Sequence, residues 1–184
     1  KLVSWQLDSE TPNIELRGRE ITVDDSEITM FAYYNYISNW EEMYSQQHTT
    51  LSGRKLILIE ADESVSLVND SVIYMNSGDI KINAGDITID DSKIVNKNVR
   101  PNASKAAGLI SLGAKRNITL TDSNIYGQTL SKFKRMQVNL EGVQLDSSNS
   151  LVAIFDERKG RSGSIDLDFR KSINLESSQI GSMG

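Results

Sequence analysis

The chain has 184 residues, of which 38% are hydrophobic, and a formal net charge of −5. This length suits one domain, and the longest apolar runs, 56–59 and 151–155, are far too short to span a membrane as a helix. The acidic balance argues against a nucleic-acid binder, which needs a basic surface; without cysteine, disulfides and thiolate sites are excluded.

One pattern recurs along the chain: an apolar-x-apolar pair, a short corner, a second such pair, then Asp-Ser and an apolar residue two positions later. Period-two alternation is typical of half-buried strands, and its return every ~20–30 residues is typical of stacked solenoid coils. In chain order, the copies cover 14–28, 57–71, 80–94, 110–125, 138–148 and 165–180.

We therefore predict an all-β fold, a right-handed parallel β-helix of about six coils that forms one domain over residues 1–184. The alternative is a β-sandwich whose strands resemble each other by accident. In the β-helix, six side chains point inward in stacked columns: Ile82, Ile89, Leu112, Leu120, Leu167 and Leu175.

The corners between the strands contain glycine on one side and Asp-Ser on the other. The glycines are expected where a bend needs a positive φ or a close approach of backbones, namely Gly18, Gly78, Gly85, Gly108, Gly113 and Gly163. The corner serines are expected at 26, 71, 92, 123, 148 and 178. Their side-chain oxygens are placed to bond backbone groups at the bend.

An acidic ladder is predicted beside these serines, with Asp25, Asp70, Asp91, Asp122 and Asp146 at equivalent corners. Calcium bridging between coils is the functional alternative, because Ca²⁺ takes six to eight oxygens. The glycine-and-aspartate nonapeptide of calcium-binding solenoids is absent from the sequence. We expect a solvated edge with no metal and no cofactor.

The segment 30–52 interrupts the repeats and is predicted to be an insertion with a short helix that begins near Ser38. Its aromatic side chains either pack against the solenoid or form a sugar- or protein-binding surface. We expect the packing role, in which replacing Trp40 by alanine destabilises the fold. The candidate binding residues are Tyr33, Tyr34, Tyr36, Trp40 and Tyr44.

No catalytic residues are predicted. The acidic residues are scattered over every repeat, and the single histidine, His48, lies in the insertion. A row of basic residues in neighbouring loops either lines a groove or keeps the loops soluble: Arg100, Lys105, Lys115, Arg116, Lys132, Lys134 and Arg135.

The best copy, Gly78-Asp-Ile-Lys-Ile-Asn-Ala-Gly-Asp-Ile-Thr-Ile-Asp-Asp-Ser-Lys-Ile94, resembles the repeats of filamentous-haemagglutinin-like, two-partner-secretion exoproteins. The resemblance covers about 13–30 and 53–184. It implies a secreted bacterial protein displayed at the cell surface as an adhesin or stalk. The alternative, from another class, is a carbohydrate-binding or polysaccharide-degrading β-helix.

The chain starts at Lys1 without a leader, and we expect it to be a piece of a longer protein. Its expected partners are other segments or copies of the same surface protein and surface glycans or matrix, with no nucleic acid and no direct membrane insertion. If its ends expose unpaired strand edges, we expect end-to-end stacking or capping by other segments.

Overall fold

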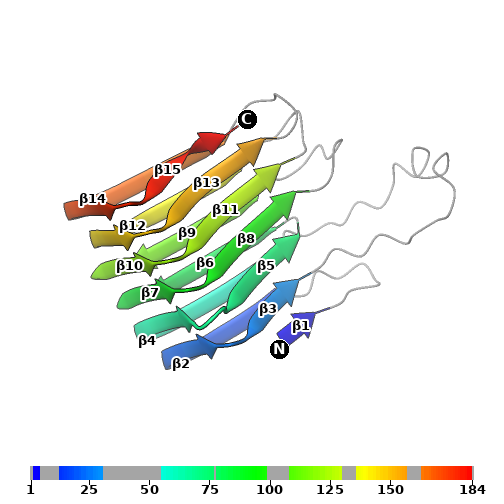
Figure 1. Cartoon of the computed structure of the whole chain (residues 1–184). Helices are drawn as coiled ribbons and strands as arrows, with labels where there is room; N and C mark the ends of the chain where they lie inside the picture. The colour runs from blue at the N-terminus through cyan, green and yellow to red at the C-terminus, as the bar shows by residue number, and fades with distance from the viewer. Residues whose placement is uncertain are drawn as a thin grey trace, which may run out of the picture.

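The computed structural model describes residues 2–4, 13–30, 55–76, 78–98, 108–129, 136–156 and 163–183. Within these ranges every regular element is a β-strand, which confirms the all-β prediction. The strands form two sheets, here called sheet A and sheet B, and every pairing in both is parallel (Figure 1).

Sheet A contains one short strand from each repeat. Its strands lie side by side in the order of the chain: β1 (Leu2–Ser4), β3 (Glu27–Met30), β5 (Val72–Asn76), β8 (Lys93–Asn98), β11 (Asn124–Thr129), β13 (Leu151–Asp156) and β15 (Gln179–Met183).

Sheet B contains the two apolar-x-apolar pairs of each repeat, joined through a bend. In some repeats the strand runs through the bend, and in others it divides there. The strands are β2 (Asn13–Asp24), β4 (Leu56–Val68), β6 (Asp79–Ala84) with β7 (Asp86–Asp90), β9 (Leu109–Ala114) with β10 (Asn117–Thr121), β12 (Gln137–Ser148) and β14 (Ser164–Glu176).

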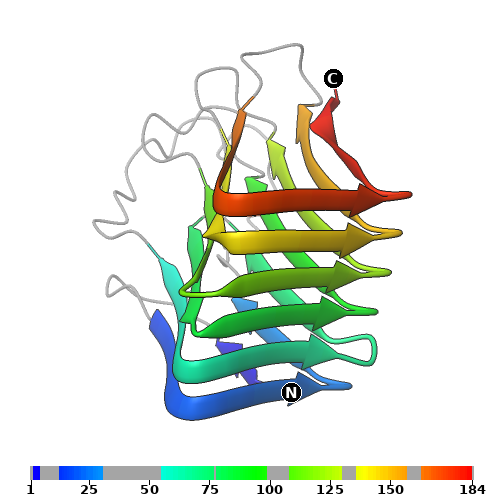
Figure 2. The same ribbon diagram turned by 90° about the vertical axis from the view of Figure 1, so that its left-hand side faces the viewer.

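Each repeat follows the same path: along the first half of sheet B, round the bend, along the second half, round a corner and back along sheet A (Figure 2). The next repeat starts again beside the first half of sheet B, so that Ile57 pairs with Ile80 and Ile80 with Ile110. This parallel stacking in a constant register is consistent with a β-solenoid.

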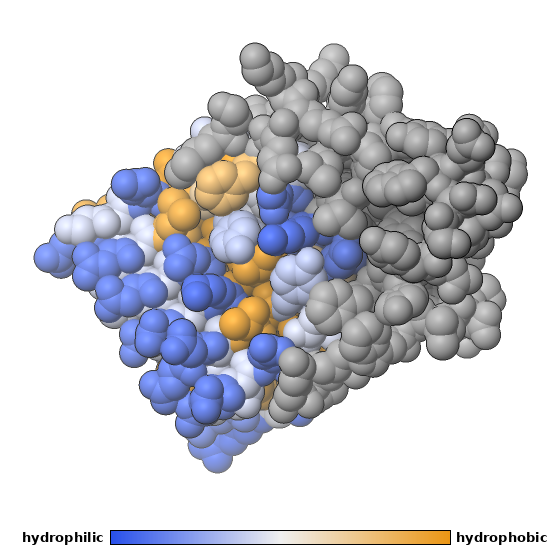
Figure 3. Space-filling model, turned by 45° about the vertical axis from the view of Figure 1, so that its right-hand side comes forward, coloured by the Kyte–Doolittle hydropathy of each residue, from blue (hydrophilic) through white to orange (hydrophobic). Residues whose placement is uncertain are grey.

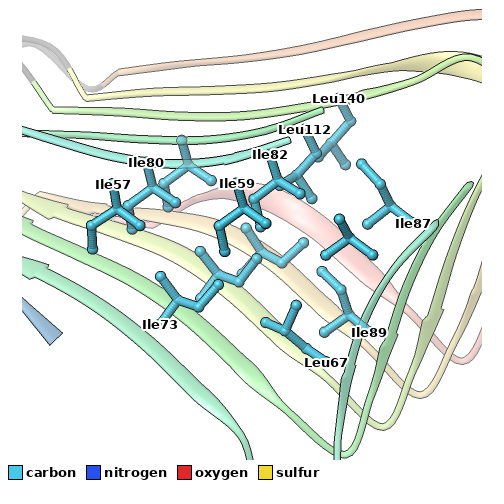
Figure 4. Close-up of a cluster of buried hydrophobic side chains, with 14 of the residues drawn as sticks. Ile57, Ile59, Leu67, Ile73, Ile80, Ile82, Ile87, Ile89, Leu112 and Leu140 are labelled. Atoms are coloured by element: carbon cyan, nitrogen blue, oxygen red, sulfur yellow. The ribbon is translucent and has the colours of Figure 1, made fainter. Parts of the chain in front are cut away.

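The core lies between the two sheets and consists of columns of equivalent residues (Figure 4). One column contains Ile59, Ile82, Leu112 and Leu140, which pair in that order and are at most 1% exposed. Dry stacking of this kind stabilises the fold by about 25 cal/mol for each Å² of apolar surface removed from water.

The predicted inward residues are buried at Ile82, Ile89, Leu112 and Leu120, as expected. The two predicted in the last repeat differ: Leu167 is half-buried and Leu175 is 48% exposed. Both occupy inward columns, but their strand β14 has a described neighbour, β12, on one side only. One-sided pairing does not by itself decide burial, because Ile14 and Val23 on β2, which also has a described partner on one side only, are each 6% exposed.

The corner between sheets B and A corrects the predicted alignment of one repeat. The residue before each corner serine adopts a left-handed backbone, with φ of 45° at Asp91, 48° at Asp122 and 48° at Asn149. The corner equivalent to Asp122-Ser123 is therefore Asn149-Ser150, and the prediction of Asp146 and Ser148 for this corner was wrong. Residues 146–148 resemble the corner pattern, but they continue strand β12 with alternating burial.

The glycines also differ from the prediction in one respect, because none of the described glycines has a positive φ. Aspartate, asparagine and serine adopt the left-handed backbone instead, since Asp and Asn tolerate it better than most residues. Close approach does explain Gly85, where a Cβ atom would overlap the carbonyl oxygen of Glu63.

The predicted insertion is described only at Met30, which ends strand β3 and is fully buried in the core. Residues 31–52, including the predicted short helix, lie outside the described residues.

Candidate functional site

A ladder of serines follows the corner between sheets B and A. The Ser123 backbone N–H donates to Oγ of Ser150 at 3.1 Å, and the Ser150 N–H donates to Oγ of Ser178 at 3.1 Å. The hydroxyls of four ladder serines, Ser92, Ser123, Ser150 and Ser178, also donate to a carbonyl two residues earlier, as Ser150 does to Ser148 at 2.7 Å. The ladder joins successive repeats through buried and part-buried bonds and is structural.

Four aspartates lie at equivalent, exposed positions beside this ladder: Asp25, Asp70, Asp91 and Asp122. Asp146 lies elsewhere, on the outer face of β12, where it accepts hydrogen bonds from Asn174 and Gln144, both at 2.7 Å. No group of three or more His, Cys, Asp or Glu suited to holding a metal ion occurs among the described residues.

An open groove of about 980 Å³ follows the bend of sheet B along the stack. Its floor consists of small residues. In most repeats the third inward-facing residue of sheet B, counted from the start of the strand, is glycine or alanine, as at Gly18, Ala61 and Ala84. Both charge signs line it: Arg17, Arg19, Lys115 and Arg170 face Glu60, Asp62, Glu141 and Asp168.

Charged residues in and beside this groove form ion pairs with residues of neighbouring repeats. Arg17 lies 3.4 Å from Glu60, and Arg19 lies 2.8 Å from Glu63. The Arg116 side chain donates from Nε to Asp86 at 2.9 Å. This hydrogen bond lowers the pKa of Asp86, opposed by partial desolvation. The groove thus has polar walls with balanced charge.

The predicted row of basic residues is described only in part. Lys115 lines the groove, and Arg116 lies beside it on the Asp86 side chain, so the structure brings these two to the bend of sheet B. The other five predicted members, Arg100, Lys105, Lys132, Lys134 and Arg135, lie outside the described residues.

The outer face of sheet A carries a column of aromatic and apolar residues. Tyr74, Val95, Tyr126 and Ala153 occupy one outward column, in which the large rings alternate with small residues. Val95 is 4% exposed and Ala153 is fully buried although both face away from the core. Figure 3 shows apolar surface as a broken strip beside hydrophilic areas.

The rings on this face interact. Tyr126 meets Phe155 edge to face, with ring centroids 5.7 Å apart, a favoured aromatic geometry. Burial raises the pKa of the Tyr74 hydroxyl, and the charge that Tyr126 would carry on ionisation adds to this. The sequence does contain a signal for this face: runs such as 151–155 are apolar at every position, which is typical of strands covered on both sides.

Buried polar groups collect where sheet A leads back into sheet B, another feature that the sequence analysis missed. Asn96 is fully buried and its Nδ2 donates to the carbonyl oxygens of Gly78 at 2.8 Å and Leu109 at 3.2 Å. Lys55 is 4% exposed, and burial lowers its pKa. Asn96 holds the starts of two sheet-B strands together, which is a structural role.

The predicted binding residues Tyr33, Tyr34, Tyr36, Trp40 and Tyr44 lie outside the described residues, as does His48. The aromatic cluster that the structure does describe is on sheet A, at Tyr74, Tyr126 and Phe155.

Comparison of the chain with family models, with curated proteins and with solved structures found no match in any of the three. In the described part of the chain, no helix has the length and apolar character needed to cross a membrane.

Proposed function

We propose that this chain is a right-handed parallel β-helix of about six coils that serves as a structural or adhesive segment of a secreted bacterial surface exoprotein, without enzymatic activity. The resemblance of its repeats to filamentous-haemagglutinin-like proteins supports the secreted, surface-displayed role. The proposed partners are other segments or copies of the same surface protein and surface glycans or matrix.

The single observation that carries this proposal is the uniform stack. Each repeat places apolar residues in the same columns and a serine at the same corner, and parallel hydrogen bonding joins every repeat to the next. Such a quasi-one-dimensional architecture extends in length without altering its cross-section, as a stalk requires. The right-handed coil is supported by the strong general preference for right-handed crossovers between parallel strands.

Surface labelling of source cells tests the location. Antibodies raised against the purified chain are expected to label intact, unpermeabilised cells, and antibodies against a cytoplasmic enzyme serve as the control. Labelling that appears only after permeabilisation contradicts the proposal. For the adhesive role, beads coated with the chain are expected to attach to matrix or glycan surfaces more strongly than albumin-coated beads.

The groove along the bend of sheet B favours a second candidate, a carbohydrate-binding or polysaccharide-degrading β-helix. The groove is open, long and polar, and it runs parallel to the stack, so that an extended polymer fits along it. Incubation of the chain with a panel of polysaccharides separates the candidates. New reducing ends or unsaturated products indicate an enzyme, and binding without cleavage indicates a carbohydrate-binding solenoid.

A further inference from the structure

The groove along the bend of sheet B is long enough for a chain-like ligand. Its lining comes from neighbouring strands and the bends that follow them, namely β2, β4, β6, β9, β12 and β14. Because neighbouring strands are about 4.7–4.9 Å apart, the groove is on the order of 25 Å long. It follows the bend, which runs along the stack (Figure 2). An extended polymer can therefore lie in it over several units.

One column of outward-facing residues crosses the groove from strand to strand. Its members pair directly in the order Arg17, Glu60, Asn83, Gly113, Glu141 and Asp168, and all of them line the groove. Every member except Gly113 has a polar or charged side chain, and Gly113 leaves a gap near the centre. The column thus offers a ligand one hydrogen-bonding group on nearly every strand.

Exposed charged side chains in the half of the groove formed by β9, β12 and β14 are available to a ligand. Within the described ranges, the side chains of Lys115, Glu141 and Arg170 form no ion pair and no hydrogen bond. At the β2 end, by contrast, Arg17 and Glu60 contact each other at 3.4 Å. The β9–β14 half therefore presents free groups of both signs.

The backbone at the bend is already hydrogen-bonded and offers little to a ligand. The Lys115 N–H donates to the carbonyl oxygen of Ala84 at 2.9 Å, and the Val143 N–H donates to that of Arg116 at 2.6 Å. A polypeptide that adds to a sheet as a further strand needs free backbone groups. Recognition in the groove therefore depends on side chains, which disfavours an extended peptide.

We infer, on the basis of the second candidate function, that the groove binds an uncharged, extended glycan whose axis follows the stack. A sugar hydroxyl both donates and accepts a hydrogen bond, so it bonds to the Glu141 carboxylate, the Lys115 ammonium and the Asn83 amide alike. One sugar unit of an extended glycan is about as long as the strand spacing of roughly 4.7–4.9 Å. Successive units therefore meet successive members of the column. A polymer that carries one charge sign throughout is repelled by the groove residues of that sign.

Matched sugar hexamers test the preference for an uncharged ligand. A mannose hexamer is compared with a mannuronate hexamer, which has a carboxylate on every unit, and a chitin hexamer with a chitosan hexamer, which has an amine on every unit. The full chain is titrated calorimetrically at mildly acidic pH, where the carboxylates and amines of the sugars are both charged. In each pair, we expect the uncharged hexamer to bind about tenfold more tightly, because like charges disfavour its counterpart.

A blocked groove tests the site. Gly113→Phe places a ring in the gap of the column, and the nearest heavy atom to its Cβ is Oδ1 of Asn83 at 3.0 Å, the end of a flexible side chain. Binding of the mannose hexamer is expected to fall by about tenfold or more because the ring occupies the path of the glycan. Ser111→Phe is the matched control, since Ser111 faces outward on the same strand but lies outside the groove lining. This control is expected to bind like the parent.

A charge deletion keeps the site testable if Gly113→Phe does not fold. Lys115→Ala is expected to weaken binding by about tenfold, the effect of losing roughly one hydrogen bond to a charged group. Lys93→Ala is the matched control, because Lys93 is exposed on β8 of sheet A and does not line the groove. Equal weakening by both changes counts against the groove.

The outcomes separate the groove site from the proposed functions. If the uncharged hexamers bind Gly113→Phe and Lys115→Ala as they bind the parent, the inference is overturned while carbohydrate binding stands. A charged hexamer that binds as tightly as its counterpart also overturns it, as does a peptide of repeated glycine and serine that binds in place of the sugars. If no hexamer binds, both the inference and the carbohydrate candidate fail, and the surface role is still tested by antibody labelling.

Discussion

Strands β7 and β14 carry the same apolar-x-apolar pattern but have different surroundings. Ile87 and Ile89 on β7 are fully buried, whereas Ile173 and Leu175 on β14 are 43% and 48% exposed. Strand β7 lies between β4 and β10, and β14 has a described neighbour only in β12. The difference shows that the core of this chain is built between repeats: a residue is buried by the strands above and below it as much as by its own strand.

The largest effect on stability is expected from a charge placed on the central strand β7. Ile89→Lys places a charge among apolar neighbours on both sides and is expected to lower the free energy of unfolding by about 4 kcal/mol or more. Leu175→Lys, the same change in the same column, is expected to cost less than about 1 kcal/mol because its ammonium reaches water. Denaturant unfolding of both variants checks this, and similar losses would show that neighbours do not govern burial.

The second largest loss of stability is expected at the corner between sheets B and A, where the serine ladder lies. Ser150→Ala removes an acceptor for the buried Ser123 N–H and a donor to the Ser148 carbonyl, and we expect a loss of about 1–3 kcal/mol. Ser148→Ala is the matched control, since its half-buried side chain lies outside the ladder, and is expected to cost about 0.5 kcal/mol or less. If Ser148→Ala proves the more costly, the predicted alignment was right and the one described here is wrong.

Relief of backbone strain at the corners is expected to have a smaller effect on stability, of equal size beside β7 and beside β14. Asp91 and Ser177 have φ of 45° and 49°, a backbone that glycine adopts with less strain, although glycine loses more entropy on folding. Asp91→Gly and Ser177→Gly are each expected to stabilise the fold by about 0.5 kcal/mol. Thermal melting measures both, with Asp90→Gly as the control, which is expected to destabilise. A gain confined to Asp91 would show that this strain depends on neighbouring repeats.

The smallest effect concerns the ion pair between Asp86 and Arg116 on the exposed bend. Because the folded state lowers the pKa of Asp86 below its ordinary 3.8, the pair stabilises the fold above that pH and loses its contribution as the pH falls through the folded pKa. For an exposed pair such as this one the contribution is small. Asp86→Asn is expected to be slightly less stable than the parent at pH 7 and equal at pH 2. A difference that persists at pH 2 contradicts the ion-pair explanation.

The fold was more predictable than the candidate sites. Period-two alternation at Ile80, Ile82, Ile87 and Ile89 indicates half-buried strands, and the structure buries all four completely. The sequence prediction was wrong at 146–150, because Asp146-Ser147-Ser148 resembles the corner pattern. The left-handed φ of Asn149 and the hydrogen bonds of Ser150 mark the corner in the structure. The repeat pattern does not predict the apolar outer face at Tyr74 and Tyr126, because it specifies the inward positions alone.

By itself, the sequence determined the strands, their parallel order and most of the core, because the spacing of apolar residues sets which face of a strand turns inward. The tertiary structure decided which of those residues become buried, since that depends on neighbours far along the chain, as Leu120 and Leu175 show. It also decided where the charged residues meet. Arg17 and Glu60 belong to different repeats, and only the register between β2 and β4 brings them to one groove.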